Sequence, residues 1–290
     1  CVLRPKAGVL HSNYLLHWVK SPAFINDMVA RATGANYPAV SDKTVKTALI
    51  PLPSFEEQQR IADTLDTADA LYRKDQELLR KYDALAQSIF YEMFGIPTQN
   101  SLGWQTEKIG DLTDVSSGST PNRERDDYFG GSIKWVKTTE VRGGKIFNTE
   151  ETLTPLGLNS SSCKLFPPKT ILIAMYGQGR TRGQVGLLEC EAATNQACAA
   201  ILPSPSFEPT FLFYALKLSY SQLRELGRGG NQQNLNLGMV KDFSVIVPDL
   251  ESQKKFVAVL HQVENSIARA VKASTHSEHL FSSLLTSYFA

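Results

Sequence analysis

An internal repeat constrains this chain more than any other feature of its sequence. When the chain is shifted by 195 positions, the stretch IPLPSFEEQQRIADTL (50–65) meets a second stretch of the same character. The matched pairs are Ile50 with Val245, Leu52 with Val247, Pro53 with Pro248, Phe55 with Leu250, Glu56 with Glu251, Gln58 with Gln253, Arg60 with Lys255, Ile61 with Phe256 and Leu65 with Leu260. A repeat of this length indicates tandem domains, because the units of a solenoid span only about 20 to 50 residues.

The repeat also extends upstream of this junction. At the same shift, Gly34 matches Gly229, Asn36 matches Asn231 and Lys46 matches Lys241. With a small loop offset, YLLHWVKSP (14–22) resembles FLFYALKLS (211–219). Further upstream, CVLRP (1–5) resembles AAILP (199–203). The first module is therefore expected to be represented by its C-terminal part, residues 1–49. A long helical region is expected over 50–98, a complete second module over 99–247 and a second long helical region over 248–290.

Each junction is followed by signals for a long helix. Ser54 and Glu57 have the spacing of a capping box, and Gly95 with the following Ile96-Pro97 ends the first helical pattern. Asp249 is a suitable cap for the second helix. At 1.5 Å per residue each helix would be roughly 60 Å long, so its apolar face needs a partner.

Apolar residues in both helical regions recur at heptad spacing, which predicts an antiparallel coiled coil. In the first region one heptad position holds Ile61, Ala68, Tyr82 and Ile89, another holds Leu65, Tyr72, Leu79, Ala86 and Met93, and Leu71, Leu78 and Leu85 are expected beside them on the same face. In the second region the two positions hold Phe256, Val263, Ala270 and Leu284, and Leu260, Ile267, Phe281 and Tyr288. The polar residues Asp75, Ser274 and Ser277 interrupt the stripes.

Residues 99–247 are typical of an α/β module with many short strands. Segments rich in β-forming residues, bounded by Gly, Pro and Ser turns, occur at 132–138, 170–176, 184–189 and 197–203. Apolar residues at helical spacing also predict a helix over 209–225. The predicted fold class is therefore α/β (α+β) with mixed short strands, combined with two long helices in an antiparallel coiled coil.

Composition does not identify the function, but it indicates the class of protein and its cellular compartment. The chain has 30 basic and 29 acidic side chains and a formal net charge of +1, so any nucleic-acid face must be local. The four cysteines form no C-x-x-C pair, which favours a reduced, cytoplasmic protein over a disulfide-rich secreted one. Apolar runs such as 170–176 are too short to span a bilayer, so no membrane segment is expected.

Three patterns bear on catalysis, and each has another interpretation. GQGRTRGQVG (177–186) has the glycines of a phosphate-binding loop but lacks Gly-Lys-Ser/Thr and opens no predicted helix. Asp249, Glu251 and Lys254 resemble the acidic-plus-lysine arrangement of metal-dependent nucleases, but their spacing is wrong for it. His276 and His279 have no third metal ligand nearby in sequence. No Asn/Asp-Pro-Pro-Tyr/Phe sequence, the mark of an aminomethyltransferase, occurs. We therefore predict neither a catalytic residue nor a metal site.

The predicted loops are rich in side chains that can read DNA. They are SSGSTPNRERDDYFGG (116–131), WVKTTEVRGGK (135–145), YGQGRTRG (176–183), TNQ (194–196) and GRGGNQQNLN (227–236). Arg and Lys suit guanine, Asn and Gln suit adenine, and Ser and Thr suit either base. Such residues also keep ordinary loops soluble. Their combination with the repeat and the paired helices favours DNA binding.

Three segments carry a resemblance to a known family: IPLPSFEEQQRIADTLDTADALYRK followed by AQSIFYEMFG, GSTPNRERDDYFGGSIKWVKTTEV, and ILIAMYGQGRTRGQVGLLECEAATNQACAAI. The first resembles the helical region of the specificity subunits of Type I restriction-modification enzymes, and the other two resemble the target-recognition domains of that family. The resemblance covers essentially the whole chain. It departs in one respect, because an intact subunit has two full recognition domains and the first is expected to be truncated in this chain.

The resemblance implies a subunit that reads DNA without catalytic activity. Each recognition domain would read one half of a split double-stranded DNA target, and the helices would set the spacing between the halves. The coiled coil would also dock two methylase subunits, through Ile61, Leu65, Tyr72, Leu79, Tyr82, Ile89, Phe256, Leu260, Val263, Ile267, Phe281 and Leu284. S-adenosylmethionine, and ATP with Mg²⁺ for restriction, would bind to the methylase and the restriction/translocase partners. This chain itself is expected to bind no cofactor.

The resemblance also places a set of residues against DNA. They are Ser117, Gly118, Ser119, Thr120, Lys137, Thr138, Thr139, Tyr176, Gln178, Arg180, Thr181, Arg182, Asn195, Gln196, Arg228, Asn231, Gln232, Gln233 and Asn234. In the first module Arg31, Gly34, Asn36 and Tyr37 would be the counterparts of the last group.

Two other functions remain open from the sequence. The helices could be the functional part of an adaptor whose loops have no DNA sequence preference, or the glycine-rich loop could bind a nucleotide in an enzyme. With one complete reader and two apolar stripes, the chain could also form a homodimer that pairs two identical readers.

Overall fold

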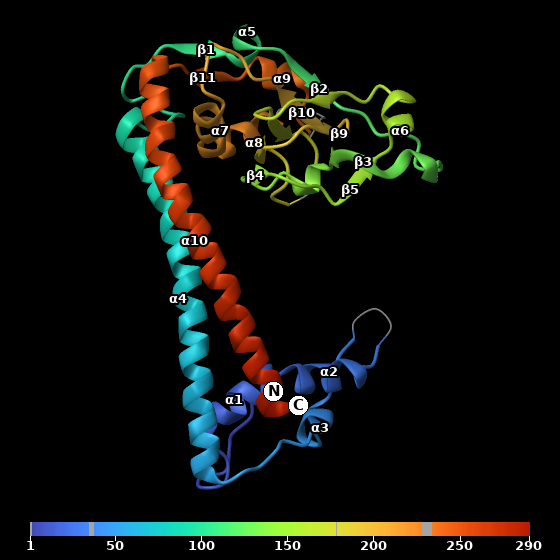
Figure 1. Cartoon of the computed structure of the whole chain (residues 1–290), viewed down its shortest axis with the longest axis vertical. Helices are drawn as coiled ribbons and strands as arrows, with labels where there is room; N and C mark the ends of the chain where they lie inside the picture. Colours follow the sequence, from blue (N-terminus) through green and yellow to red (C-terminus); the bar gives the residue numbers. More distant parts are fainter. Residues whose placement is uncertain (1, 35–37, 178, 228–233) are drawn as a thin grey trace. The chain divides into compact units, whose positions relative to one another are not determined.

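The computed structural model describes residues 2–34, 38–177, 179–227 and 234–290, and it contains two compact units (Figure 1). Unit 1 consists of Cys1–Ala84 and Val263–Ala290, and unit 2 consists of Leu85–Gln262. The long helices α4 (Phe55–Phe94) and α10 (Leu250–Phe289) contribute residues to both units.

Unit 2 contains three small sheets built from short strands. The five-stranded sheet has the order β2 (Val115–Ser117), β10 (Cys198–Ile201), β7 (Ile171–Ala174), β8 (Val185–Leu188) and β4 (Lys145–Ile146). The four-stranded sheet has the order β5 (Glu151–Leu153), β3 (Phe129–Val136), β9 (Ala192–Thr194) and β6 (Leu165–Phe166). The third pairs β1 (Thr106–Lys108) with β11 (Ser244–Ile246). Parallel pairs β3/β9 and β4/β8 occur beside antiparallel ones, which confirms the predicted mixed strands.

Short helices connect these strands. They are α5 (Ile109–Leu112), α6 (Pro155–Asn159), α7 (Pro209–Leu218), α8 (Tyr220–Leu226) and α9 (Leu237–Lys241), with the 3-10 helices η1 (Asp126–Tyr128) and η2 (Thr138–Glu140). The prediction of one helix over 209–225 is wrong in detail, because the chain breaks into two helices at Ser219. The buried Ser219 hydroxyl donates a 2.7 Å hydrogen bond to the carbonyl of Ala215, a side-chain bond of the type that bends helices.

The core of unit 2 lies where α7 packs against the five-stranded sheet and the ends of the long helices. Phe90 and Phe94 of α4 meet Phe211 of α7 and Phe256 of α10, and among these four rings the centroids of each pair that includes Phe90 or Phe94 are 4.8 to 5.8 Å apart. All four side chains are fully or almost fully buried. Burying an aromatic side chain contributes about 1.5 to 3 kcal/mol.

Unit 1 contains three short helices, α1 (Ser12–Lys20), α2 (Pro22–Ala30) and α3 (Asp42–Lys46). Side chains of α1 and α2, among them Tyr14, Trp18 and Phe24, pack in a cluster with residues of α4 and α10. The Ser54 hydroxyl accepts a 3.2 Å bond from the Glu57 N–H, so Ser54 caps α4. The Glu57 carboxylate instead accepts hydrogen bonds from the Arg60 guanidinium at 2.6 and 2.8 Å. The predicted capping box is therefore only half formed. Asp249 caps α10 through the Ser252 N–H at 2.9 Å.

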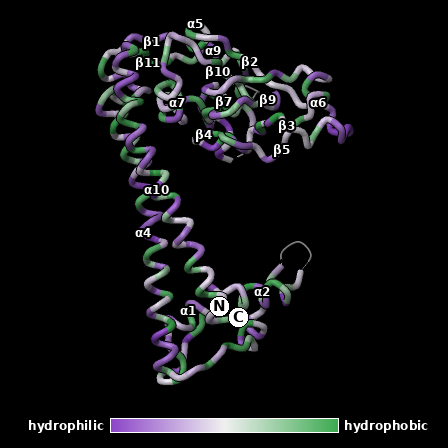
Figure 2. The backbone as a smooth tube through the Cα atoms, viewed as in Figure 1, coloured by the Kyte–Doolittle hydropathy of each residue, from purple (hydrophilic) through white to green (hydrophobic). Residues whose placement is uncertain are grey.

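The antiparallel coiled coil is confirmed by contacts within each unit. In unit 1, Gln76 on α4 meets Ser274 on α10, whereas Leu65, earlier in α4, packs in a cluster with Leu285 and Phe289, later in α10. Of the predicted core residues, Ile61, Leu65, Phe256, Leu260 and Val263 are buried, and Tyr72, Leu79, Tyr82, Ile89, Ile267, Phe281 and Leu284 are half-buried. Figure 2 shows hydrophobic and hydrophilic residues alternating along both helices.

One predicted row of this interface is wrong. Leu71, Leu78 and Leu85 were expected on the buried face, but they are 46%, 40% and 44% exposed. Each precedes a residue of the buried stripe by one position, and one residue corresponds to about 100° around a helix. The contact is therefore a narrow coiled-coil seam that these leucines flank.

The two units repeat one arrangement of elements. The order α1, α2, α3 and α4 in unit 1 corresponds to α7, α8, α9, β11 and α10 in unit 2, with residues 49–51 at the position of β11. A buried glutamine marks the equivalence. Gln58 donates to the Pro53 carbonyl at 3.0 Å and accepts from the N–H of His11, the residue that precedes α1. Gln253 makes the same contacts to Pro248 and to Glu208, which precedes α7, at 2.7 and 2.8 Å.

Candidate nucleic-acid interface

The loop between β7 and β8 holds exposed residues of the predicted DNA-binding set, among them Tyr176 and Arg180. Gly177, Gly179 and Gly183 adopt positive φ angles of 144°, 59° and 83°, which L side chains rarely adopt. The loop closes at its base through the Gly183 N–H, which donates to the Ala174 carbonyl at 2.8 Å. It leads into strand β8 and opens no helix, so it lacks the geometry of a phosphate-binding P-loop.

Helix α8 braces this loop. The Tyr220 hydroxyl donates a 2.8 Å hydrogen bond to the backbone carbonyl of Arg180, and the Arg224 guanidinium donates to the same hydroxyl at 2.8 Å. Gly183 lies so close that a Cβ there would stand 3.3 Å from the Arg224 backbone nitrogen. The backbone of the loop is thus held, while the side chains of Tyr176 and Arg180 are exposed.

Two arginines meet in a groove beside the loop. A pocket of about 260 Å³ is lined by Thr139, Val141, Arg142, Arg180, Thr181 and Gln184. Among the described residues, the exposed Arg180 guanidinium has no hydrogen bond or ion pair, and the buried Nε of Arg182 has none either. The exposed Arg180 guanidinium is therefore available to an anionic or hydrogen-bonding ligand, whereas the Nε of Arg182 is buried and Arg142 donates to the Thr139 carbonyl at 2.6 Å.

A second group of predicted residues forms a neighbouring cluster. Gly118 lies against Thr194 so tightly that a Cβ would clash with its backbone oxygen, and the Ser119 N–H donates to that oxygen at 2.9 Å. The Thr120 hydroxyl bonds the Gln196 side chain at 2.5 Å. The structure therefore brings Ser117–Thr120 together with Asn195 and Gln196, although the Asn195 side chain accepts the Ala197 N–H and has a role within the loop.

Lys137 is neutralised within the protein. Its ammonium lies 2.9 Å from both Glu150 and Glu151, and hydrogen bonding to these carboxylates raises the pKa of Lys137. Hydrogen bonds from Lys137 and Arg123 lower the pKa of Glu151. A phosphate would have to displace these carboxylates before Lys137 could bind it. Its neighbours Thr138 and Thr139 carry no such charge.

Three residues near this interface were not predicted from the sequence. Arg142 and Gln184 line the groove, and Arg123 lies over the rings of Phe129 and Trp135 at 4.7 and 4.8 Å. Arg142 and Arg123 belong to polar loops that were recognised as such, but sequence spacing does not show which arginine of a loop reaches a groove.

Several predicted residues lie outside the described part of the chain. They are Gln178, Arg228, Asn231, Gln232 and Gln233, together with Asn36 and Tyr37 of the first module. Asn234 and Tyr176 are exposed, and Arg31 pairs with Asp27 at 2.8 Å.

The alternative catalytic groups do not converge. Asp249 is occupied as a helix cap and Glu251 pairs with Lys255 at 2.7 Å. His276 and His279 are exposed on α10. Within the described ranges, no group of three His, Cys, Asp or Glu side chains could hold a metal ion, and no helix there is long and apolar enough to cross a membrane.

Comparisons with known proteins identify relatives. The family model of the Type I restriction modification DNA specificity domain matches residues 1–80 and 101–274. The Type I restriction enzyme MjaIX specificity subunit of Methanocaldococcus jannaschii is 25% identical over 284 residues, covering 91% of this chain and 64% of the relative. The HindI specificity subunit of Haemophilus influenzae is 28% identical over 175 residues, covering 57% and 37%. The chain thus spans less than two thirds of the length of these curated relatives.

Solved structures share the fold. The HsdS subunit from Thermoanaerobacter tengcongensis superposes with a TM-score of 0.51 at 22% identity, covering 100% of this chain and 72% of that chain. The Type-I restriction-modification system S subunit from M. genitalium gives a TM-score of 0.62 at 16% identity, covering 98% and 74%.

Proposed function

The chain belongs to the family of the Type I restriction modification DNA specificity domain, and on this premise we propose that it is a sequence-specific DNA-binding subunit. The observation that carries the proposal is the groove between η2 and the β7–β8 loop, where Arg142 and Arg180 lie with hydroxyl and amide groups. This donor set matches the chemistry of base edges and phosphates. The alternative, an adaptor without DNA sequence preference, would leave Arg180 without a partner, whereas Arg142 already donates to the Thr139 carbonyl at 2.6 Å and lies 4.0 Å from Glu150.

The division of labour between this chain and its partners is part of the proposal. The chain reads DNA without catalysis, and two methylase subunits and a restriction/translocase subunit carry S-adenosylmethionine, ATP and Mg²⁺. The coiled coil docks the methylase subunits. The residues before α4 represent the C-terminal part of a first recognition domain, and unit 2 holds most of a complete one.

Individual contacts follow from the loops. Arg180 and Arg182 have the fork geometry that binds the O6 and N7 atoms of guanine, whereas Ser117, Ser119 and Thr120 suit phosphate or either base. Asn234 and the residues before it would add amide contacts to adenine.

The test is to co-purify the chain with its methylase subunit and to map methylated adenines on random-sequence DNA. A split motif with a constant gap is expected, and its symmetry reports whether one or two readers act. A stable complex that methylates without sequence preference would favour the adaptor. Sedimentation of the isolated chain tests the homodimer, because an intramolecular helix pair predicts a monomer at micromolar concentration.

A further inference from the structure

Two consecutive carboxylates, Glu150 and Glu151, stand where the chain enters strand β5, which lies beside β3 in unit 2 (Figure 1). The antiparallel register places Glu151 opposite Trp135, two residues before Lys137. The Glu140 carboxylate accepts the backbone N–H groups of Lys137 and Glu150, each at 2.9 Å. Because Glu140 belongs to η2, these bonds tie the backbone of Glu150 to the 3-10 helix that borders the candidate groove.

The two carboxylates form a charge cluster with Lys137, Arg123 and Arg142. Glu151 lies 2.9 Å from the Lys137 ammonium and 2.5 Å from the Arg123 guanidinium. Glu150 lies 2.9 Å from the same ammonium and 4.0 Å from the Arg142 guanidinium. Together with the carboxylate of η2, three carboxylates are balanced by three cations.

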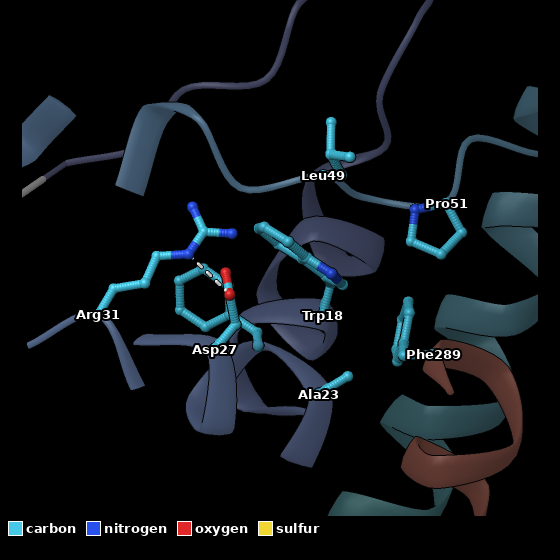
Figure 3. A pocket seen from close by; sticks show the side chains of 8 residues that line it. Trp18, Ala23, Asp27, Arg31, Leu49, Pro51 and Phe289 are labelled. Atoms are coloured by element: carbon cyan, nitrogen blue, oxygen red, sulfur yellow. Dashed lines mark ion pairs between the residues drawn. The ribbon is translucent and has the colours of Figure 1, made fainter. Parts of the chain in front are cut away.

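An ion pair of the ordinary kind occurs in unit 1, beside a pocket of about 240 Å³ that Phe289 borders (Figure 3). There the carboxylate of Asp27 pairs with the guanidinium of Arg31, four residues further along the chain, at 2.8 Å. Pairs of this kind contribute little to stability. The charge cluster differs from it, because its members come from separate segments that the β3–β5 ladder and η2 bring together beside the candidate interface.

Glu150 is the outward carboxylate at the start of β5. Its side chain is 59% exposed, whereas that of Glu151 is 30% exposed. A carboxylate has about four acceptor sites, so its two neighbouring cations leave acceptor capacity on an exposed side chain. Arg142, one of these cations, lines the groove together with Arg180. Glu150 can therefore accept a further hydrogen bond at the edge of the groove.

The balancing cations allow this carboxylate to approach DNA. An isolated carboxylate is repelled by the phosphates, whereas one held between Lys137 and Arg142 belongs to a cluster with little net charge. In the major groove cytosine presents only a donor, its N4 amino group, whereas adenine adds the N7 acceptor and guanine presents two acceptors. A carboxylate accepts hydrogen bonds and donates none, so cytosine is the base that it matches.

We propose that Glu150 is a specificity-determining residue that accepts a hydrogen bond from the N4 amino group of a cytosine in the DNA target. The inference rests on the proposed function and adds a base reader that complements the guanine-binding arginines. Lys137 is then a positioning residue, which holds and neutralises Glu150. This role accounts for a lysine of the predicted DNA-binding set that is paired within the protein.

The test selects duplexes from a random-sequence library with the complete chain in complex with its methylase subunit, and the bound DNA is sequenced. The parent complex is expected to select a motif with cytosine at a position that depends on Glu150. Glu150→Gln should change the preference there to adenine, because an amide suits adenine, and Glu150→Ala should abolish it. In both variants discrimination in favour of cytosine should fall by about ten-fold, and the rest of the motif should persist.

Glu191→Gln is the matched control, because it makes the same change of charge on an exposed side chain of unit 2 and should leave the motif unchanged. A motif that lacks cytosine, or that keeps every cytosine in both Glu150 variants, overturns the assignment. A uniform rise in affinity for all duplexes also overturns it, since Glu150 would then only repel phosphates. A parent complex without any sequence preference overturns the proposed function together with this inference.

Discussion

The hydroxyl of Ser277 donates a 2.8 Å hydrogen bond to the carboxylate of Asp75 across the two long helices. Next to it, the Gln76 amide donates to the Ser274 hydroxyl at 2.7 Å. Both serines are almost fully buried. The polar residues that interrupt the apolar stripes therefore meet one another, and such pairs specify the register of a coiled coil.

Ser277→Ala is expected to destabilise unit 1 by about 1 kcal/mol, because the Asp75 carboxylate loses a partner in a partly dry contact. Chemical denaturation measures the effect. Thr275→Ala on the exposed face of the same helix is the control, since its hydroxyl bonds only the Val271 carbonyl of its own helix. Equal stability of the two variants would show that the Asp75 contact does not stabilise the pair.

Gln253→Met is expected to cost about 2 to 4 kcal/mol, because it leaves the Glu208 N–H and the Pro248 carbonyl without partners in the interior. Gln58→Met should destabilise unit 1 in the same way, because it removes the hydrogen-bond partner of the His11 N–H and of the Pro53 carbonyl. The two residues share no partner, so the effects should add in the double variant. Urea denaturation of the three variants measures the loss of stability. An unchanged stability of Gln253→Met would contradict the stabilising role of the Gln253 hydrogen bonds.

Arg180→Ala or Arg182→Ala is expected to weaken binding to the cognate DNA by about 1 to 3 kcal/mol if the guanidinium contacts guanine. Binding to unrelated DNA should fall much less. Arg73→Ala on the long helix, where the side chain is exposed and paired with Asp69, serves as the control. Unchanged cognate affinity in both loop variants would remove the assignment.

Tyr220→Phe tests whether helix α8 positions the β7–β8 loop. The variant loses the bond to the Arg180 carbonyl, and we expect the ratio of cognate to non-cognate affinity to fall several-fold, by about 1 kcal/mol, with an unchanged melting temperature. Tyr91→Phe is a matched control, because its hydroxyl also has one side-chain partner, Gln87, at 2.9 Å. A parallel loss of stability and specificity would point to a structural role alone.

Asp66 makes unit 1 sensitive to acid. Burial of the carboxyl raises its pKa, but hydrogen bonds from the buried His17 and from Asn13, both 2.7 Å long, outweigh burial and lower it below the ordinary value. A lowered carboxyl pKa contributes stability above the unfolded pKa, and this stability is lost as the pH falls through the folded pKa. Asp66→Asn should therefore flatten the fall in melting temperature below about pH 5, and the exposed Asp63→Asn should not.

The sequence predicted the elements that depend on local pattern. The helix limits at Ser54, Gly95 and Asp249 follow from capping chemistry, and heptad spacing identified the seam residues. It failed at Leu71 and its equivalents because apolar character alone does not say which side of a helix is covered. The break at Ser219 was missed for a similar reason, since a serine bends a helix only when its hydroxyl turns to the backbone.

The repeat, the two long helices and the polar loops can be predicted from the order of the residues, because periodicity and internal similarity are properties of that order. Three relationships depend on the packing: Arg142 and Arg180 line one groove, Glu151 neutralises Lys137, and Phe289 borders a pocket whereas Phe94 is covered by Trp104. Those relationships depend on how segments far apart in sequence pack together. Local patterns carry no information on such distances.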